Sequence, residues 1–223
     1  MPFKYSCFIS YRHGQRRMMQ QIINDLHDAL SSEIEIWMDK EVYLDRERLQ
    51  GGDFYNEALA TAICESLCMI LVFTPKYFSR EHTYCAREYK AMEELESRRL
   101  KSWGKLWSLD TKKNKQHELI IPHGLIIPIV VRGEDHLPHE IKKRRQYYNF
   151  EDFLLGAESI NSRSDFARQI RNIAKYIADM YRTLETLSED PCQGCESFVL
   201  PTEDEINLWI DEVQGPRPPF PMP

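Results

Sequence analysis

Hydrophobic and polar residues alternate along this chain with two different periods, and each change of period predicts the boundary of an element. Short apolar runs rich in β-branched and aromatic residues have the length of strands. They lie at residues 3–10, 34–39, 67–73, 125–131 and 146–150. Apolar residues that recur every three or four positions predict helices between these runs. The helices are expected at residues 17–30, 53–65, 83–100 and 165–187.

The run at 67–73, LCMILVF, is apolar throughout, as is typical of a parallel strand that is buried on both faces. Strands that alternate with helices imply right-handed crossovers and a parallel sheet covered by helices on both sides. We therefore predict an α/β domain with a central parallel sheet of four to five strands. Pro128 suggests that the fourth strand lies near an edge of this sheet. We interpret residues 40–52 as a charged connection and residues 104–124 as an inserted loop with one short strand at most.

The helix at 83–100 carries one acid on the wrong side. Helical spacing places Glu88 between Tyr84, Cys85 and Met92 on the apolar side, whereas the other charged residues lie opposite. A glutamate near a helix start can also solvate itself or offset the helix dipole, and the helix alone does not decide between that role and a functional one.

Ligands of parallel sheets bind outside the carboxyl ends of the strands. Glu88 lies early in the helix that follows the third predicted strand, so it is expected to face this edge. The predicted strand ends bring further polar side chains to the same edge. They are Ser10, Tyr11, Arg12, Asp39, Thr74 and Arg132.

Composition describes an ordinary globular protein, since 42% of the residues are hydrophobic and 29% are charged. No apolar run has the roughly 18–20 residues that a membrane span needs, and we expect a cytoplasmic protein. The net charge of −6 is concentrated in residues 188–223, which carry eight acids and one arginine. We divide the chain into a domain at 1–187 and this acidic, proline-rich tail. A nearly neutral body with an acidic tail argues against nucleic-acid binding.

The six cysteines are scattered, and we expect reduced, buried thiols rather than a disulfide framework. Cys192-x-x-Cys195 has no second pair of ligands, so we interpret it as two thiols in a turn and expect no metal site. Residues 202–205 form a capping box ahead of an apolar stripe. They predict a short helix near 203–213, which packs either on its own domain or on a partner.

Several nucleotide-binding signatures are absent. The chain has no G-x-G-x-x-G after the first strand and no Walker A motif. A phosphate-accepting receiver domain needs acids after the first and third strands, and this chain has Ser10-Tyr11-Arg12 and Thr74-Pro75 there.

In their order and spacing, five segments resemble the Toll/interleukin-1 receptor (TIR) domain of the prokaryotic, enzymatic kind. The resemblance covers residues 3–187. The segments are FISYRH (8–13), IWMD (36–39), LQGGDF (49–54), LCMILVFTPKYFS (67–79) and YCARE (84–88).

This resemblance implies a flavodoxin-like three-layer sandwich and, in the enzymatic members, cleavage of NAD+ at the bond between nicotinamide and ribose. NAD+ is then the substrate, and no cofactor is needed. The catalytic glutamate of the family corresponds to Glu88, and the tryptophan usual four residues earlier is Tyr84 here. The resemblance implies a substrate cleft lined by Ser10, Tyr11, Arg12, Asp39, Leu49, Gly52 and Tyr84.

The acceptor of the ribosyl group decides the product. Water gives ADP-ribose, whereas an adenine or ADP-ribose atom gives a cyclic or conjugated form. With only the acidic tail after the core, the chain is similar to the messenger-producing subunits of Thoeris-like antiphage systems, whose nucleotide product activates a separate effector protein. Related domains often complete their sites by self-association, for which residues 40–52 are the expected contact loop. The alternatives are an NAD-depleting effector and a non-catalytic adaptor that acts through TIR–TIR contacts.

Overall fold

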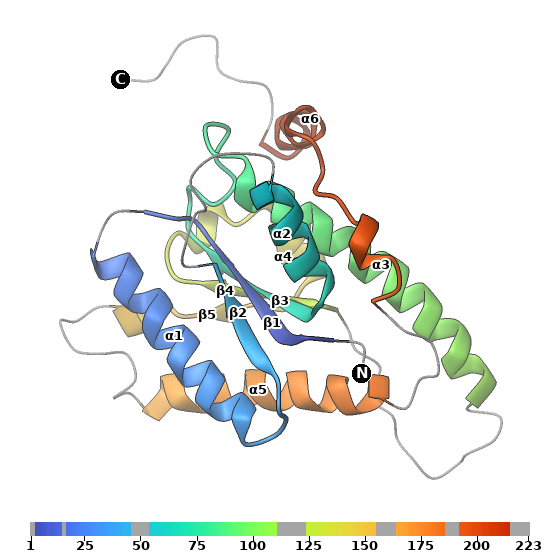
Figure 1. The fold of residues 1–223 in the computed structure, drawn as a ribbon. Helices are drawn as coiled ribbons and strands as arrows, with labels where there is room; N and C mark the ends of the chain where they lie inside the picture. Colours follow the sequence, from blue (N-terminus) through green and yellow to red (C-terminus); the bar gives the residue numbers. More distant parts are fainter. Residues whose placement is uncertain are drawn as a thin grey trace, which may run out of the picture.

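Five parallel strands form the centre of the molecule in the order β2-β1-β3-β4-β5 (Figure 1). The computed structural model describes residues 3–14, 17–45, 54–110, 124–154, 164–185 and 192–214. The strands are β1 (Tyr5–Tyr11), β2 (Glu41–Leu44), β3 (Ser66–Phe73), β4 (Ile126–Val130) and β5 (Tyr148–Asn149).

Helices cover both faces of this sheet. Figure 1 shows α1 and α5 together along one face, with α2 and α3 on the other. This arrangement confirms the predicted α/β class and the flavodoxin-like layering. The helices are α1 (Arg17–Glu35), α2 (Phe54–Cys64), α3 (Tyr84–Asp110), α4 (His139–Arg144), α5 (Ser164–Glu185) and α6 (Glu203–Gln214).

The core is built around β3, in which every residue is buried. Of its flanking strands, β4 is buried at every position and β1 at all but its two end residues, and helices from both layers contact β1 and β3. On the α5 side, the predicted stripe is a core face. Its described members are Phe166, Ile170, Ile173, Ile177, Met180 and Leu184, all buried.

The predicted second strand at 34–39 is wrong. Ile34 is fully buried and belongs to α1, where it continues the stripe of Leu26 and Leu30 at intervals of four residues. The helix then ends in a turn in which the backbone N–H groups of Trp37 and Met38 both donate to the carbonyl of Ile34, at 2.9 Å each. The alternating letters IEIW imitate a strand, but burial of Ile34 against the core extends the helix by one more turn.

The true strand, β2, begins only at Glu41. The predicted loop at 40–52 is therefore wrong in its first part, and residues 46–52 lie outside the described residues. Asp39 precedes β2 and is exposed, so it lies at the amino edge of the sheet rather than at the carboxyl end of a strand. The acid that follows β2 is Asp45, which is buried.

Two other boundaries differ from the sequence prediction or refine it. The predicted loop at 104–124 is helical at its start, because α3 continues to Asp110; residues 111–123 lie outside the described residues.

Pro128 lies in β4, which is next to the edge strand β5 as expected. The backbone groups of Leu125 and Val131 form hydrogen bonds with β3, whereas the carbonyl of Val130 accepts one from the β5 side. Because the bonding direction alternates along a strand, the ring nitrogen of Pro128 faces the β5 side. The pairing of β4 with β5 begins only at Ile129. The missing N–H therefore removes no sheet hydrogen bond.

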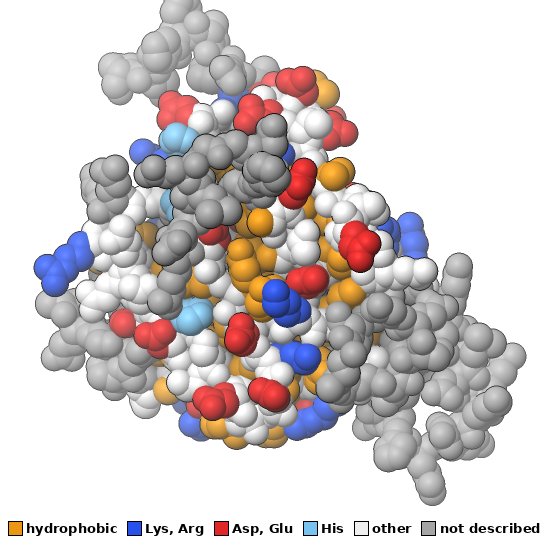
Figure 2. Space-filling model, viewed as in Figure 1, with side chains coloured by type: hydrophobic (Ala, Val, Ile, Leu, Met, Phe, Trp, Pro, Cys, Tyr) orange, Lys and Arg blue, Asp and Glu red, His pale blue; other side chains and the backbone are white. Residues whose placement is uncertain are grey.

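The segment 192–214, here called the tail segment, packs on its own domain. The indole of Trp209 stacks on Tyr89, with ring centroids 5.6 Å apart, and meets the edge of Phe78 at 5.3 Å. The predicted capping box is present, since the backbone N–H of Thr202 donates to Oε2 of Glu205 at 2.8 Å. Figure 2 shows acidic side chains on the outer surface around α6, whose first turn alone carries three acids.

Two polar contacts reinforce this packing. Arg80 forms an ion pair with Asp211 at 2.8 Å. Nε of Arg87 donates to the carbonyl of Pro201 at 2.7 Å. Because Arg87 is the neighbour of Glu88, the tail segment is attached directly to the part of α3 that carries this acid.

The prediction of six reduced thiols is wrong for two of them. Cys64, at the end of α2, forms a disulfide with Cys195 in the tail segment, and the two residues are 131 positions apart. Their Cα atoms are 5.5 Å apart, within the range of ordinary disulfides. Cys7, Cys68 and Cys85 are buried thiols, as expected. Spacing could not reveal the bond, because the tertiary fold alone brings these two cysteines together.

No helix within the described ranges is both long and apolar enough to cross a membrane.

We expect Cys195→Ser to lower the free energy of unfolding by about 3–5 kcal/mol, because a bond that closes so long a loop restricts the unfolded chain. Guanidinium unfolding without reductant measures this loss. Dithiothreitol should lower the midpoint of the parent protein and leave that of Cys195→Ser unchanged. Cys192→Ser is the matched control, since it removes a nearby thiol and leaves the bond. Equal stabilities of the two variants would contradict a stabilising role of the bond.

Candidate active site

Glu88 lies on the second turn of α3 and is only 6% exposed. Its Oε2 atom accepts a hydrogen bond from the hydroxyl of Ser10, which is buried near the carboxyl end of β1. The structure thus brings together two residues that the sequence predicted for one site. A hydrogen-bonded carboxylate inside an apolar layer is costly to maintain, which points to a role beyond packing.

Ser10 is also bonded to the hydroxyl of Tyr77. Ser10 has a single proton, and it donates this proton to Glu88, so Tyr77 is the donor to Ser10. Tyr77 is fully buried in the connection that follows β3. Burial raises the pKa of Tyr77 well above its usual value, and the neighbouring Cys85 and Glu88 add to the effect. The phenol therefore stays protonated and keeps the chain Tyr77–Ser10–Glu88 directed toward the carboxylate.

A second polar group lies where β1 and β2 end. The hydroxyl of Tyr11 donates to the carbonyl of Asp45 at 3.0 Å, and its ring stacks on His13 with centroids 4.4 Å apart. Nε2 of His13 lies 3.9 Å from a carboxylate oxygen of Asp45. These contacts fix an aromatic and an imidazole ring beside a buried acid at the same sheet edge as Glu88.

Arg12 and Tyr84 supply the other predicted side chains at this edge. The Nε atom of Arg12 is buried and has no hydrogen-bond partner among the described residues. A guanidinium with an unused donor is well suited to an anionic ligand group. Tyr84 opens α3 one turn before Glu88 and is 36% exposed, with its ring 5.5 Å from the guanidinium of Arg87.

Three predicted residues are not brought to this group by the described structure. Asp39 lies at the opposite edge of the sheet, because the strand it was thought to end begins after it. The prediction that places Asp39 beside Glu88 is therefore wrong. Leu49 and Gly52 lie outside the described residues, so their predicted roles remain predictions.

Sequence reasoning missed Asp45, His13 and Tyr77. Asp45 would have followed from choosing EVYL as the second strand, since the acid comes directly after it. His13 ends the segment FISYRH and directly follows Arg12, which was the available signal for it. Tyr77 stands in the turn after β3, where its position close to the sheet edge was the available signal.

The electrostatics of the site disfavour negative charge. Tyr43 of β2 stacks on Phe8 with centroids 5.2 Å apart. Burial, together with the acids Asp45 and Glu88 and the neighbouring Tyr5, raises the pKa of Tyr43 to about 12. A group that develops positive charge would be stabilised by the same carboxylates that resist ionisation of this phenol.

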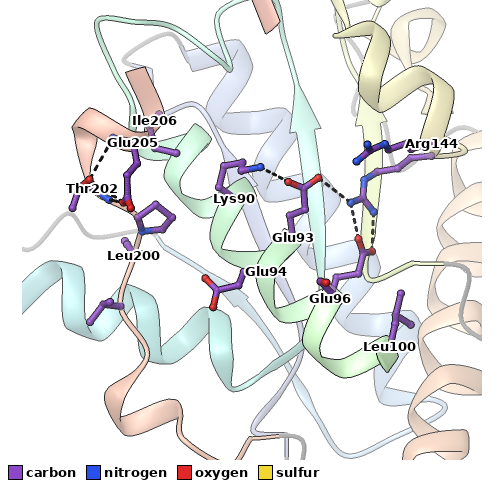
Figure 3. Close-up of a pocket in the computed structure, with 14 residues that line it drawn as sticks. Lys90, Glu93, Glu94, Glu96, Leu100, Arg144, Leu200, Thr202, Glu205 and Ile206 are labelled. Carbon is purple, nitrogen blue, oxygen red and sulfur yellow. Dashed lines mark hydrogen bonds and ion pairs between the residues drawn. The ribbon is translucent and has the colours of Figure 1, made fainter. Parts of the chain in front are cut away.

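Another hollow, of about 950 Å³, lies between α3, the end of α4 and residues 199–206 (Figure 3). Lys90, Glu94 and Ser97 line it from the side of α3 roughly opposite Glu88. Its charges satisfy one another, since Lys90 contacts Glu93 at 2.5 Å and Arg145 contacts Glu96 at 2.6 Å. Paired charges of this kind are structural, and the group around Glu88 is the better candidate for chemistry.

In the described part of the chain, no group of three or more His, Cys, Asp or Glu side chains could hold a metal ion. The chemistry available at this edge is that of a buried carboxylate, hydroxyl groups, an imidazole and a guanidinium.

Comparison with known protein families gives a match to the TIR domain over residues 7–163, which is more than half of the chain. The match includes Ser10, Tyr77 and Glu88. A comparison with curated proteins gives no match.

We expect Ser10→Ala to destabilise the protein by about 1–3 kcal/mol, because Glu88 loses a buried donor and Tyr77 an acceptor. Urea unfolding at pH 7 measures this loss. Ser6→Ala is the matched control, because Ser6 is buried in the same strand and its hydroxyl donates to a backbone carbonyl, that of Glu41, at 2.8 Å. This substitution should cost less. A Ser10→Ala variant as stable as the parent would refute the proposed support of Glu88.

Alkaline pH should destabilise the fold through Tyr43. Below pH 10 the phenol is neutral in folded and unfolded chains, so its contribution is fully present. Between pH 10 and about 12 an unfolded tyrosine ionises while Tyr43 remains protonated. Ionisation stabilises the unfolded state, so the free energy of unfolding falls. Thermal unfolding at pH 8, 10 and 11, with phenolate absorbance, tests this. Tyr43→Phe should reduce the loss above pH 10, and an unchanged loss would exclude Tyr43 as a cause.

Proposed function

The chain belongs to the TIR domain family, and we propose that it cleaves NAD+ at the nicotinamide–ribose bond with Glu88 as the catalytic carboxylate. One observation carries this proposal: a buried carboxylate, oriented by Ser10, lies at the carboxyl edge of the parallel sheet. A fold that hosts both enzymes and adaptors does not require an acid at this place for packing.

The chemistry suits a site with a single essential carboxylate. Ordinary glycosidases need a second acid to protonate the leaving oxygen. In NAD+ the C–N bond breaks with its electron pair going to the pyridinium nitrogen, so nicotinamide leaves as a neutral base and needs no proton. The ribose becomes an oxocarbenium-like cation, which Glu88 stabilises most strongly where water is excluded.

The neighbouring side chains have complementary roles in this proposal. Ser10 and Tyr77 hold Glu88 in one orientation. Arg12 offers its unused buried donor to the diphosphate, since a guanidinium matches phosphate oxygens in charge and geometry. Tyr84, one turn before Glu88 and partly exposed, provides an aromatic surface for a base.

The product depends on which nucleophile reaches the ribosyl cation. Water adds and loses a proton to give ADP-ribose, whereas a nitrogen or hydroxyl of the same or another nucleotide gives a cyclic or conjugated form. We favour an ADP-ribose-derived messenger that activates a separate effector in antiphage defence, as in the Thoeris-like systems that the sequence resembles. Self-association is common among TIR domains, and we expect it to complete the site.

The test is NAD+ turnover by the purified protein, followed by mass spectrometry of all nucleotide products. Glu88→Gln should lose about a hundredfold or more of the rate, because it removes the charge that stabilises the transition state. Glu94→Gln is the matched control, since Glu94 is an exposed acid of the same helix, and it should keep the parent rate. Activity per molecule should rise with protein concentration if assembly completes the site.

Equal turnover by the parent and Glu88→Gln would show that Glu88 is not catalytic. No turnover by the parent, even at high concentration or with a crowding agent, would favour the adaptor role. In that case Glu88→Ala would retain biological activity, while substitutions that disrupt TIR–TIR contacts would abolish it.

A further inference from the structure

Three cysteines lie close together where the tail segment reaches the end of α2. Cys64 and Cys195 form the disulfide. Cys192, three residues before Cys195, keeps its thiol, and its Sγ atom lies 3.6 Å from the carbonyl oxygen of Cys64. The backbone N–H of Cys195 donates to the carbonyl of Cys192 at 3.1 Å, so the C-x-x-C sequence is folded into a tight turn. The thiol of a third cysteine is thus held next to the backbone of both cysteines that form the disulfide.

The three sulfurs differ in their access to solvent. Cys64 is 2% exposed and Cys195 is 6% exposed, so a solute has little access to their bond. Cys192 is half-buried, so it is the most exposed of the three cysteine residues. Any reaction of the buried bond with a solute therefore has its easiest route through Cys192.

A fixed positive charge lies in the same place. The guanidinium of Arg99 is almost completely buried and donates to the carbonyl of Ser66 at 2.9 Å and to that of Cys64. Burial lowers the pKa of Arg99 to about 10, and its charge, still present at neutral pH, interacts with Cys192. A nearby cation favours the thiolate form of a cysteine, both as attacking and as leaving group.

We propose that Cys192, Cys195 and Cys64 form a thiol–disulfide exchange site, which reacts with low-molecular-weight thiols of the glutathione type. The thiolate of Cys192 attacks Sγ of Cys195, a Cys192–Cys195 bond forms, and the Cys64–Cys195 bond breaks. The electron pair leaves on Cys64, which takes up the proton that Cys192 lost. This step is an isomerisation and needs no oxidant.

Reduction follows from the new bond, which is carried by the better exposed cysteine. One thiol molecule attacks Cys192 and releases Cys195 as a thiol. A second molecule then attacks the mixed disulfide and releases Cys192. The protein gains two thiols in total, and the two small thiols leave as their own disulfide.

The exchange changes how the tail segment is held. In the starting state the Cys64–Cys195 bond ties it covalently to α2, and in the product both linked cysteines belong to the tail segment itself. The ion pair of Arg80 with Asp211 and the stacking of Trp209 on Tyr89 then hold α6 without covalent support. The site is therefore a redox-controlled attachment of the tail segment to the domain.

The experiment follows the oxidised full chain after addition of reduced glutathione at pH 7. Samples are quenched by alkylation, and their disulfides are mapped by mass spectrometry without reduction. The Cys64–Cys195 link should disappear at least about tenfold more slowly in Cys192→Ser than in the parent, because the accessible attacking thiolate is missing. Ser197→Ala, an exposed substitution two residues after Cys195, should react at the parent rate. Cys192→Ala serves as a second variant if the serine substitution perturbs folding.

Hydrogen exchange of residues 203–214, measured on the same samples, reports on the tail segment. We expect a Cys192–Cys195 bond or a glutathione adduct at Cys192 to appear as amide protection in α6 falls. Equal rates in Cys192→Ser and the parent would overturn the exchange site. Alkylation of Cys64 and Cys195 before any reductant is added would show that they are thiols, and it would overturn the exchange site as well. A mapped Cys64–Cys192 bond, or unchanged protection of α6, would overturn the release of the tail segment.

Discussion

The burial of β3 on both faces is the constraint on which the rest of this structure depends. A strand without a solvent face needs helices on both sides, and connections that cross over through these helices join strands that run parallel. Their carboxyl ends necessarily meet at one edge. The hydroxyl of Ser10 therefore meets the acid of α3, although 78 positions separate Ser10 from Glu88. The same geometry places the connection with Tyr77 at this edge, so the polar chain around Glu88 follows from the layer order.

Most of the fold could be predicted because its strongest signals are local. The run at 67–73 and the stripe of α5 each report their own burial, and both predictions are confirmed. The second strand failed because a helix end and a strand start look alike over six residues, and only packing of Ile34 on the core decides between them. That error moved the predicted acid from Asp45 to Asp39. The disulfide was missed for a related reason, since its spacing in the sequence carries no signal.

The candidate site contrasts with its surroundings in how its polar groups are satisfied. Glu96 is also a buried acid of α3, but it faces Arg145 and the N–H of Leu125 and is neutralised in place. Glu88 accepts a hydrogen bond from the hydroxyl of Ser10, a neutral donor that orients the carboxylate. A neutral donor fixes the orientation of a carboxylate without bringing an opposing charge, and an oriented carboxylate is what stabilisation of a cation requires. The donors that the two glutamates meet therefore differ, and helix periodicity alone could not reveal that difference.

The docking of α6 on α3 also has a consequence for biosynthesis. Ribosomes release the N-terminal part of a chain first, and domains fold as their residues emerge. Tyr89 and Phe78 are covered by Trp209, which lies more than 100 positions later. During translation these rings form an uncovered aromatic surface on an otherwise complete sheet, and Cys64 waits as a thiol for a partner that has not been made. Folding of this domain can therefore finish only after the tail segment has been synthesised.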